Sequence, residues 1–79
     1  MADRYTDKQG QYLAFIYYYS KVHRCSPSEK DMQVYFDVTP PSVHQMVLKL
    51  AEKGLISRTP RQPRSIKLLV NRNEIPDLE

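Results

Sequence analysis

The stretch from Thr39 to Gly54 constrains the fold more than any other part of the chain, because it carries a helix start, a helix stop and one apolar stripe. Thr39 can cap a helix with its hydroxyl, and Pro40 suits the first helical position. Gly54 suits the left-handed residue that ends a helix. The apolar residues between them recur at intervals of three and four, at Val43, Met46, Val47 and Leu50. The pattern predicts a helix over residues 39–53 with one face in a core.

The opposite face of this predicted helix is polar. At about 100° per residue, the side chains that project away from the apolar stripe are Pro41, Gln45, Lys49 and Glu52, flanked by Ser42 and His44. The first half of this face is small, neutral and rich in hydrogen-bonding groups. Such a face is either a plain solvated helix surface or a surface that contacts base edges in a major groove.

Two more helices are predicted before this one. Thr6-Asp7-Lys8-Gln9 has the form of a capping box and predicts a helix from about Asp7 to Val22. Pro27 breaks the chain after it, and one or two residues of 23–27 fit a short strand. Ser28 can then cap a second, short helix that ends near Phe36. The second and third helices lie about three residues apart, which is typical of a helix-turn-helix.

The pattern changes to a strand-like period after Gly54. Residues 55–58 and 65–70 are short runs with β-branched residues, and the loop between them holds two prolines and two arginines. The sequence therefore predicts an α+β, mainly α fold: a winged helix-turn-helix with three helices and a small antiparallel hairpin of two or three strands. We expect this domain to cover residues 1–70, followed by a loose acidic tail over 71–79. The predicted core is Leu13, Ile16, Met32, Phe36, Val43, Met46, Val47, Leu50, Leu55 and Ile66.

Basic residues gather in the second half of the chain. Residues 1–48 carry five basic and five acidic residues, whereas residues 49–72 carry seven basic residues against Glu52 alone, a net charge of +6. Residues 73–79 add three acids, which leaves the chain a formal net charge of +3. A local positive field attracts a polyanion or an acidic surface.

Several classes of function are disfavoured by composition. One cysteine, two histidines and two glycines provide no disulfide framework, no metal-ligand spacing and no phosphate-binding loop. We therefore expect neither an enzyme nor a bound cofactor, metal or small molecule. No apolar run is long enough to cross a bilayer, and a cytoplasmic location is expected.

Tyr17, Tyr18 and Tyr19 form a dense aromatic cluster on the first predicted helix. Their rings either wall the core with the hydroxyls in solvent, or form a surface for a partner.

Taken together, these segments resemble the amino-terminal DNA-binding domain of the LexA repressor family, a winged helix-turn-helix, over about residues 5–70. The matching elements are Thr6-Asp7-Lys8-Gln9 with Leu13, Phe15 and Ile16, then Pro27-Ser28, then Leu50-Ala51-Glu52-Lys53-Gly54-Leu55-Ile56, then Arg64-Ser65-Ile66-Lys67-Leu68-Leu69. The resemblance implies sequence-specific binding of duplex DNA by the third helix, usually as a dimer on a two-fold operator.

The chain departs from the family pattern in three places. His23-Arg24-Cys25 replaces a glycine before the proline loop, and Phe36-Asp37 replaces Leu-Gly at the helix-turn-helix corner, where Asp tolerates turn geometry. The repressor's second domain, with its self-cleaving Ser-Lys pair and main dimer interface, is absent from this sequence, so we expect no self-cleavage. The base-contacting positions also differ, so the operator does not transfer.

We therefore expect a repressor-like transcriptional regulator with helix 39–53 in the major groove of double-stranded DNA and the basic wing 57–67 on its backbone. The candidate DNA contacts are Thr39, Pro41, Ser42, His44, Gln45, Lys49, Arg58, Arg61, Arg64 and Lys67. Gln45 is the best candidate for a base, because its amide can pair bidentately with adenine; Lys49 and the wing suit phosphate.

Two further expectations concern partners. A lone domain contacts only a few base pairs, so we expect a homodimer on a two-fold site, with the tyrosine cluster and the tail as its contacts. The alternative function is a winged-helix protein-interaction module that binds an acidic partner. Duplex affinity that falls steeply with salt distinguishes DNA binding from this alternative.

Overall fold

The structure, a computed structural model, describes residues 4–79, so the first three residues of the predicted domain lie outside it. Its elements are, in chain order, α1 (Asp7–His23), α2 (Glu29–Phe36), α3 (Pro40–Glu52), β1 (Ile56–Ser57), β2 (Lys67–Leu68) and the 3₁₀ helix η1 (Arg72–Glu74). Three helices and a two-stranded antiparallel sheet confirm the predicted winged helix-turn-helix.

The helices begin where the sequence places their caps. The Thr6 hydroxyl accepts the Gln9 N–H at 3.1 Å, and the Gln9 side chain accepts the Thr6 N–H at 2.9 Å. The same reciprocal bonds join Ser28 and Asp31 at the start of α2. These capping boxes satisfy backbone donors that a helix leaves unpaired at its first turn.

The helix ends follow from left-handed residues. Arg24 and Asp37 have φ of 59° and 54° after α1 and α2, and Gly54 has φ of 76° just after α3. The Leu55 N–H then donates to the Leu50 carbonyl at 3.0 Å, which closes the end of α3. The turn at Asp37 leaves only three residues between α2 and α3.

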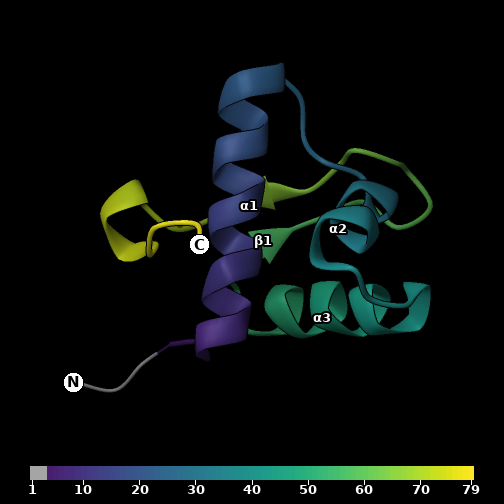
Figure 1. The fold of residues 1–79 in the computed structure, drawn as a ribbon, viewed down its shortest axis with the longest axis horizontal. Helices are drawn as coiled ribbons and strands as arrows, with labels where there is room; N and C mark the ends of the chain where they lie inside the picture. The colour runs from purple at the N-terminus through teal and green to yellow at the C-terminus, as the bar shows by residue number, and fades with distance from the viewer. Residues whose placement is uncertain (1–3) are drawn as a thin grey trace.

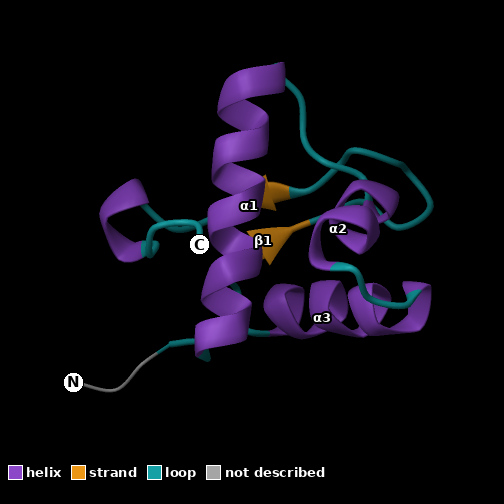
Figure 2. Cartoon of the chain, in the orientation of Figure 1, coloured by secondary structure: helices purple, strands orange, loops and turns teal. Residues whose placement is uncertain are grey.

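The helices are arranged around α1, which stands at the centre of the molecule (Figure 1). On one side of α1 lie α2, α3 and the loop of the hairpin, and on the other side lies the C-terminal segment with η1 (Figure 2). The structure thus gathers the helix-turn-helix and the wing on the same side of the first helix.

The sheet is shorter than the sequence predicts. Ile56 pairs with Leu68 and Ser57 with Lys67, so each strand has two residues instead of the four to six expected. The strand predicted within residues 23–27 is not formed in the described chain. Arg24 has a left-handed φ, and the Ser26 hydroxyl donates to the Ile66 carbonyl in place of a backbone ladder.

The core confirms most of the predicted apolar residues. Eight of the ten predicted residues are buried, whereas Phe36 and Met46 are half-buried and pack against them. The Phe36 ring stacks on Tyr12, with ring centroids 4.1 Å apart. The core also includes residues that the sequence analysis did not select: Tyr12, Ala14, Phe15, Ile56 and Ile75.

The expectation that residues 71–79 are loose is wrong. Ile75 is 5% exposed and belongs to the core. The Tyr5 hydroxyl donates to the Glu74 carbonyl, and Gln11 exchanges two hydrogen bonds with the backbone of Asp77 and Glu79, at 3.0 and 2.8 Å. The segment is held because it buries an isoleucine and bonds its backbone to side chains of α1.

Candidate nucleic-acid interface

The start of α3 is organised by Thr39 and Ser42. The Thr39 hydroxyl accepts the Ser42 N–H at 3.4 Å and lies 2.9 Å from the Ser42 hydroxyl. Both hydroxyls therefore serve the helix cap, and Pro41 stands exposed between them. A DNA contact by Thr39 or Ser42 would have to share these groups with the cap.

The outer face of α3 lies in solvent as the stripe predicts. Pro41, His44, Gln45 and Lys49 are all exposed, while Val43, Val47 and Leu50 are buried on the opposite face. Within residues 4–79 the side-chain hydrogen bonds of this helix and its cap involve Thr39, Ser42 and His44, which leaves the Gln45 amide free. A free amide can use its donor and acceptor together on a base edge.

His44 is joined to the first residue of α2. Its Nδ1 lies 3.3 Å from the Glu29 carboxylate, across the helix-turn-helix. Both side chains are more than a third exposed, so the pair contributes little to stability. The contact fixes where the imidazole points, toward α2 and the wing.

The wing loop has a defined backbone. The Gln62 N–H donates to the Thr59 carbonyl at 3.1 Å, with Pro60 second in the turn and Arg61 at φ 66° third. Ser65 then closes the loop, because its hydroxyl accepts the Thr59 N–H at 2.9 Å and donates to the Thr59 carbonyl at 3.1 Å. The basic side chains of the wing therefore project from a closed loop.

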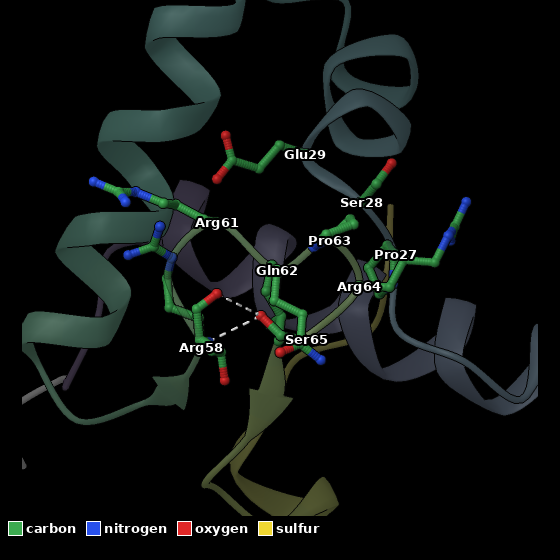
Figure 3. Close-up of a pocket in the computed structure, with 11 residues that line it drawn as sticks. Pro27, Ser28, Glu29, Arg58, Arg61, Gln62, Pro63, Arg64 and Ser65 are labelled. Atoms are coloured by element: carbon green, nitrogen blue, oxygen red, sulfur yellow. Dashed lines mark hydrogen bonds between the residues drawn. The ribbon is translucent and has the colours of Figure 1, made fainter.

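A cavity of about 230 Å³ separates the wing from the start of α2 (Figure 3). Arg58, Arg61 and Gln62 line it from the wing, and Ser28 and Glu29 line it from α2. Arg58 and Arg61 extend to the same side of this cavity (Figure 3). The structure thus brings two predicted cations next to the helix-turn-helix.

Arg64 points elsewhere, although the sequence analysis grouped it with the phosphate contacts. Its Nη1 donates to the Tyr19 hydroxyl at 3.1 Å and to the Ser26 carbonyl at 3.0 Å, and lies 3.1 Å from the Asp31 carboxylate. The bond to Tyr19 leads the causes that raise the pKa of Arg64 above its usual value. The Arg64 guanidinium is thus engaged with α1, α2 and the loop between them, and the prediction that it contacts a phosphate is not supported by this geometry.

Lys67 is also set apart from the other candidates. It lines a groove with Tyr17, Ser20 and Lys21, between α1 and β2. That groove shares no basic residue with the cavity between the wing and α2. The backbone of Lys67 thus pairs with Ser57, next to Arg58, but its side chain lines a different groove from that of Arg58.

The tyrosine cluster is bonded within the chain. Tyr18 accepts a hydrogen bond from Arg72 at 2.8 Å, and Tyr19 accepts the one from Arg64. The Arg72 guanidinium also lies over the Tyr17 ring, 5.3 Å from its centroid. The rings of Tyr17 and Tyr19 pack against the core, as the first predicted role has it. The hydroxyls of Tyr18 and Tyr19, however, accept hydrogen bonds from arginines of the same chain.

The positive run of residues 49–72 is split by these contacts. Among the described residues, the basic partners in ion pairs are Arg4, His44, Arg64 and Arg72. Lys49, Arg58 and Arg61 have no acidic partner there. In residues 49–72 the positive charge without an acidic partner therefore lies on Lys49 and Lys53 at the end of α3, on Arg58 and Arg61 in the wing, and on Lys67 in β2.

Two residues near this surface were not predicted to be part of it. Gln9 lines a groove along α3 with Pro41 and Gln45, and its side chain accepts a hydrogen bond from the Lys53 ammonium at 2.7 Å. Glu29 orients His44. The local sequence pattern places Gln9 and Glu29 only in the first turns of their own helices. Their position beside α3 depends on tertiary packing, which the pattern does not reveal.

A helix-turn-helix with an exposed hydrogen-bonding second helix, followed by a hairpin with uncompensated cations, defines a winged-helix DNA-binding domain. The family model described as the iron-dependent repressor, N-terminal DNA-binding domain, matches residues 4–62, and the chain belongs to this family.

The chain is also similar to LexA repressors. That of Thermosipho melanesiensis is 39% identical over 70 residues, which cover 89% of this chain and 35% of the relative. That of Thermosipho africanus is 41% identical over 64 residues, covering 81% of this chain and 32% of the relative. The predicted resemblance is confirmed, and the chain spans about a third of the length of these relatives.

The iron in the family's description has no matching ligand set in the described part of the chain. Residues 4–79 contain no group of three or more His, Cys, Asp or Glu side chains that could hold a metal ion. None of the described helices is long and apolar enough to cross a membrane.

Proposed function

We propose that the chain binds double-stranded DNA sequence-specifically and acts as a repressor-like, non-enzymatic regulator of transcription. One observation carries this proposal: the exposed face of α3 holds Lys49 and contacts Glu29 through His44, and Glu29 lines one cavity with Arg58 and Arg61. Lys49, Arg58 and Arg61 have no acidic partner in residues 4–79. Neutral amide and hydroxyl groups suit base edges, whereas uncompensated cations suit phosphates.

In this arrangement the amino-terminal half of α3 enters the major groove. Gln45 contacts a base edge through its free amide, and Pro41 and His44 flank it. Arg58 and Arg61 approach the backbone from the wing, and Lys49 approaches it from α3. Thr39 and Ser42 contribute through the hydroxyl pair that caps the helix.

We further propose that two copies occupy a two-fold DNA site, because one domain contacts too few base pairs for useful specificity. The tyrosine cluster and the tail, first considered as the dimer contacts, are engaged within one chain. The assembly is therefore expected to form on DNA. Binding of one protein per selected site would argue against it.

The test is the salt dependence of duplex binding. If Lys49, Arg58 and Arg61 each neutralise one phosphate, log affinity per protomer should fall against log salt with a slope of about −3. Arg61→Ala should make this slope shallower by about one unit and weaken all sequences alike. Lys8→Ala is the matched control, because Lys8 lies with Tyr35 and Glu79 and outside the proposed surface. Absence of duplex binding at low salt would favour the protein-interaction module instead.

A further inference from the structure

A shallow groove of about 410 Å³ runs along the exposed side of α3, next to the start of α1. It is lined by Gln9, Pro41, Ser42, Gln45, Met46 and Lys49. Four of these residues belong to the surface that the proposed function places in the major groove. The groove is therefore within reach of whatever base edges α3 contacts.

The polar groups of this groove are largely in use. The Gln9 oxygen accepts bonds from the Thr6 N–H at 2.9 Å and the Lys53 ammonium at 2.7 Å, and the Ser42 hydroxyl is paired with Thr39. Pro41 is exposed and Met46 is half-buried, so a proline ring and a thioether chain present apolar atoms to the groove. The Gln45 amide and the Lys49 ammonium also line the groove, and neither has a side-chain hydrogen bond within residues 4–79.

Thymine is the base that matches an apolar surface in the major groove. Its C5-methyl group is the apolar feature of the base edges there, while adenine offers the donor and acceptor that a glutamine amide can pair with. Cytosine and guanine would bring polar edges against Pro41 and Met46 without a partner for them.

We propose that Pro41 and Met46 contact the C5-methyl group of a thymine that lies next to the base contacted by Gln45. The bound site then contains an A·T base pair at this position. This inference rests on the proposed DNA binding and adds the base class that the site selects. Removing one buried methyl group should weaken binding about fourfold.

The experiment replaces thymine by uracil, which lacks the methyl group but keeps the pairing edge. Preferred duplexes are first selected from random sequences with the 79-residue chain. Each thymine of the selected site is then replaced in turn, and affinity is measured at one salt concentration. The affinity of the wild type should fall about fourfold when one particular thymine of each half-site is replaced, and should change little for the other thymines.

Variants locate the effect. Pro41→Ala and Met46→Ala should bind the thymine and uracil duplexes almost equally. Pro41 is exposed and has no part in the core, so its variant keeps the test valid if Met46→Ala unfolds. Lys49→Ala is the control: it should weaken both duplexes and preserve the fourfold ratio.

The outcomes separate the two proposals. Selective duplex binding in which every uracil is harmless, or a fourfold ratio that survives in Pro41→Ala or in a folded Met46→Ala, overturns the methyl contact and leaves DNA binding intact. Absence of duplex binding at low salt overturns both.

Discussion

The guanidinium of Arg64 donates a hydrogen bond to the hydroxyl of Tyr19 over 3.1 Å. This bond joins the end of the wing loop that leads into β2 to α1. The same nitrogen lies 3.1 Å from the Asp31 carboxylate at the start of α2. Because each strand of the hairpin has two residues, the sheet alone gives the wing little support. Arg64 is thus placed to set the position of the wing relative to the helix-turn-helix.

Arg64→Ala should weaken duplex binding, because the variant loses the bonds that hold the wing against α1 and α2. The slope of log affinity against log salt should change by less than one unit, because the cations assigned to phosphates, Lys49, Arg58 and Arg61, are all still present. Titrations at several salt concentrations measure both quantities.

A double-mutant cycle tests whether Arg64 affects binding through its contact with Tyr19. Arg64→Ala and Tyr19→Phe should be less than additive in binding free energy, because both break one network. Arg61→Ala and Tyr19→Phe are the matched pair and should add. A slope that becomes shallower by a full unit in Arg64→Ala would return Arg64 to the phosphate contacts.

Gln45→Ala should cost about 1–3 kcal/mol on the preferred duplex and leave non-specific binding nearly unchanged, because the amide contacts a base and not the backbone. Lys49→Ala should show the opposite pattern and weaken every sequence alike. Site selection with wild type and both variants makes the comparison. Equal enrichment of one sequence by wild type and Gln45→Ala would show that Gln45 contacts no base.

The stability of the domain should fall in acid partly through Asp31. The hydrogen bond from the Ser28 N–H holds the pKa of the Asp31 carboxyl below its usual value of 3.8. The unfolded chain therefore binds this proton first, so the contribution is present above pH 3.8 and is lost as the pH falls through the folded pKa.

Unfolding by denaturant between pH 2 and pH 6 checks this pH dependence. Asp31→Asn should unfold with a shallower decline of free energy below about pH 4 than the wild type. Asp37→Asn is the control, because Asp37 is exposed and Asn tolerates its left-handed backbone. Parallel acid profiles for wild type and Asp31→Asn would contradict the assignment.

Ile75→Ala should lower the free energy of unfolding by about 2–4 kcal/mol, since it deletes a buried side chain of the core. Leu69→Ala is the matched control, because Leu69 is 57% exposed, and should change stability by less than about 0.5 kcal/mol. Denaturant unfolding measures both. A small loss for Ile75→Ala would mean that the C-terminal segment does not stay packed in solution.

Local signals predicted the three helices because their caps and apolar stripes lie within a few residues of one another. Thr6, Ser28 and Thr39 cap the helices as expected, and Gly54 has the left-handed φ that ends α3. The outer face of α3 followed from the same periodicity. These features depend on the backbone of one helix and not on distant neighbours.

The features that the sequence did not reveal depend on contacts between distant residues. Burial of Ile75 is decided by α1, and nothing in Glu74-Ile75-Pro76 distinguishes a packed segment from a loose one. Arg64 is one of four cations in a loop and strand of similar composition, and only the fold brings Tyr19 and Asp31 to it. The left-handed φ of 57° at Arg64 could not be predicted either, because the residue at this position is not a glycine.

The packing of residues 71–79 has a practical consequence for handling the molecule. Arg4 pairs with Glu74 at 2.8 Å, so the two ends of the described chain come together. The C-terminal segment lies on the side of α1 away from the wing (Figure 1). The chain ends beside α2, where the Tyr35 hydroxyl donates to the Glu79 carbonyl at 3.1 Å. A flexible tether attached after Glu79 would leave from there, outside the residues of α3 and the wing that are proposed to contact DNA, and could anchor the domain to a sensor surface without covering them.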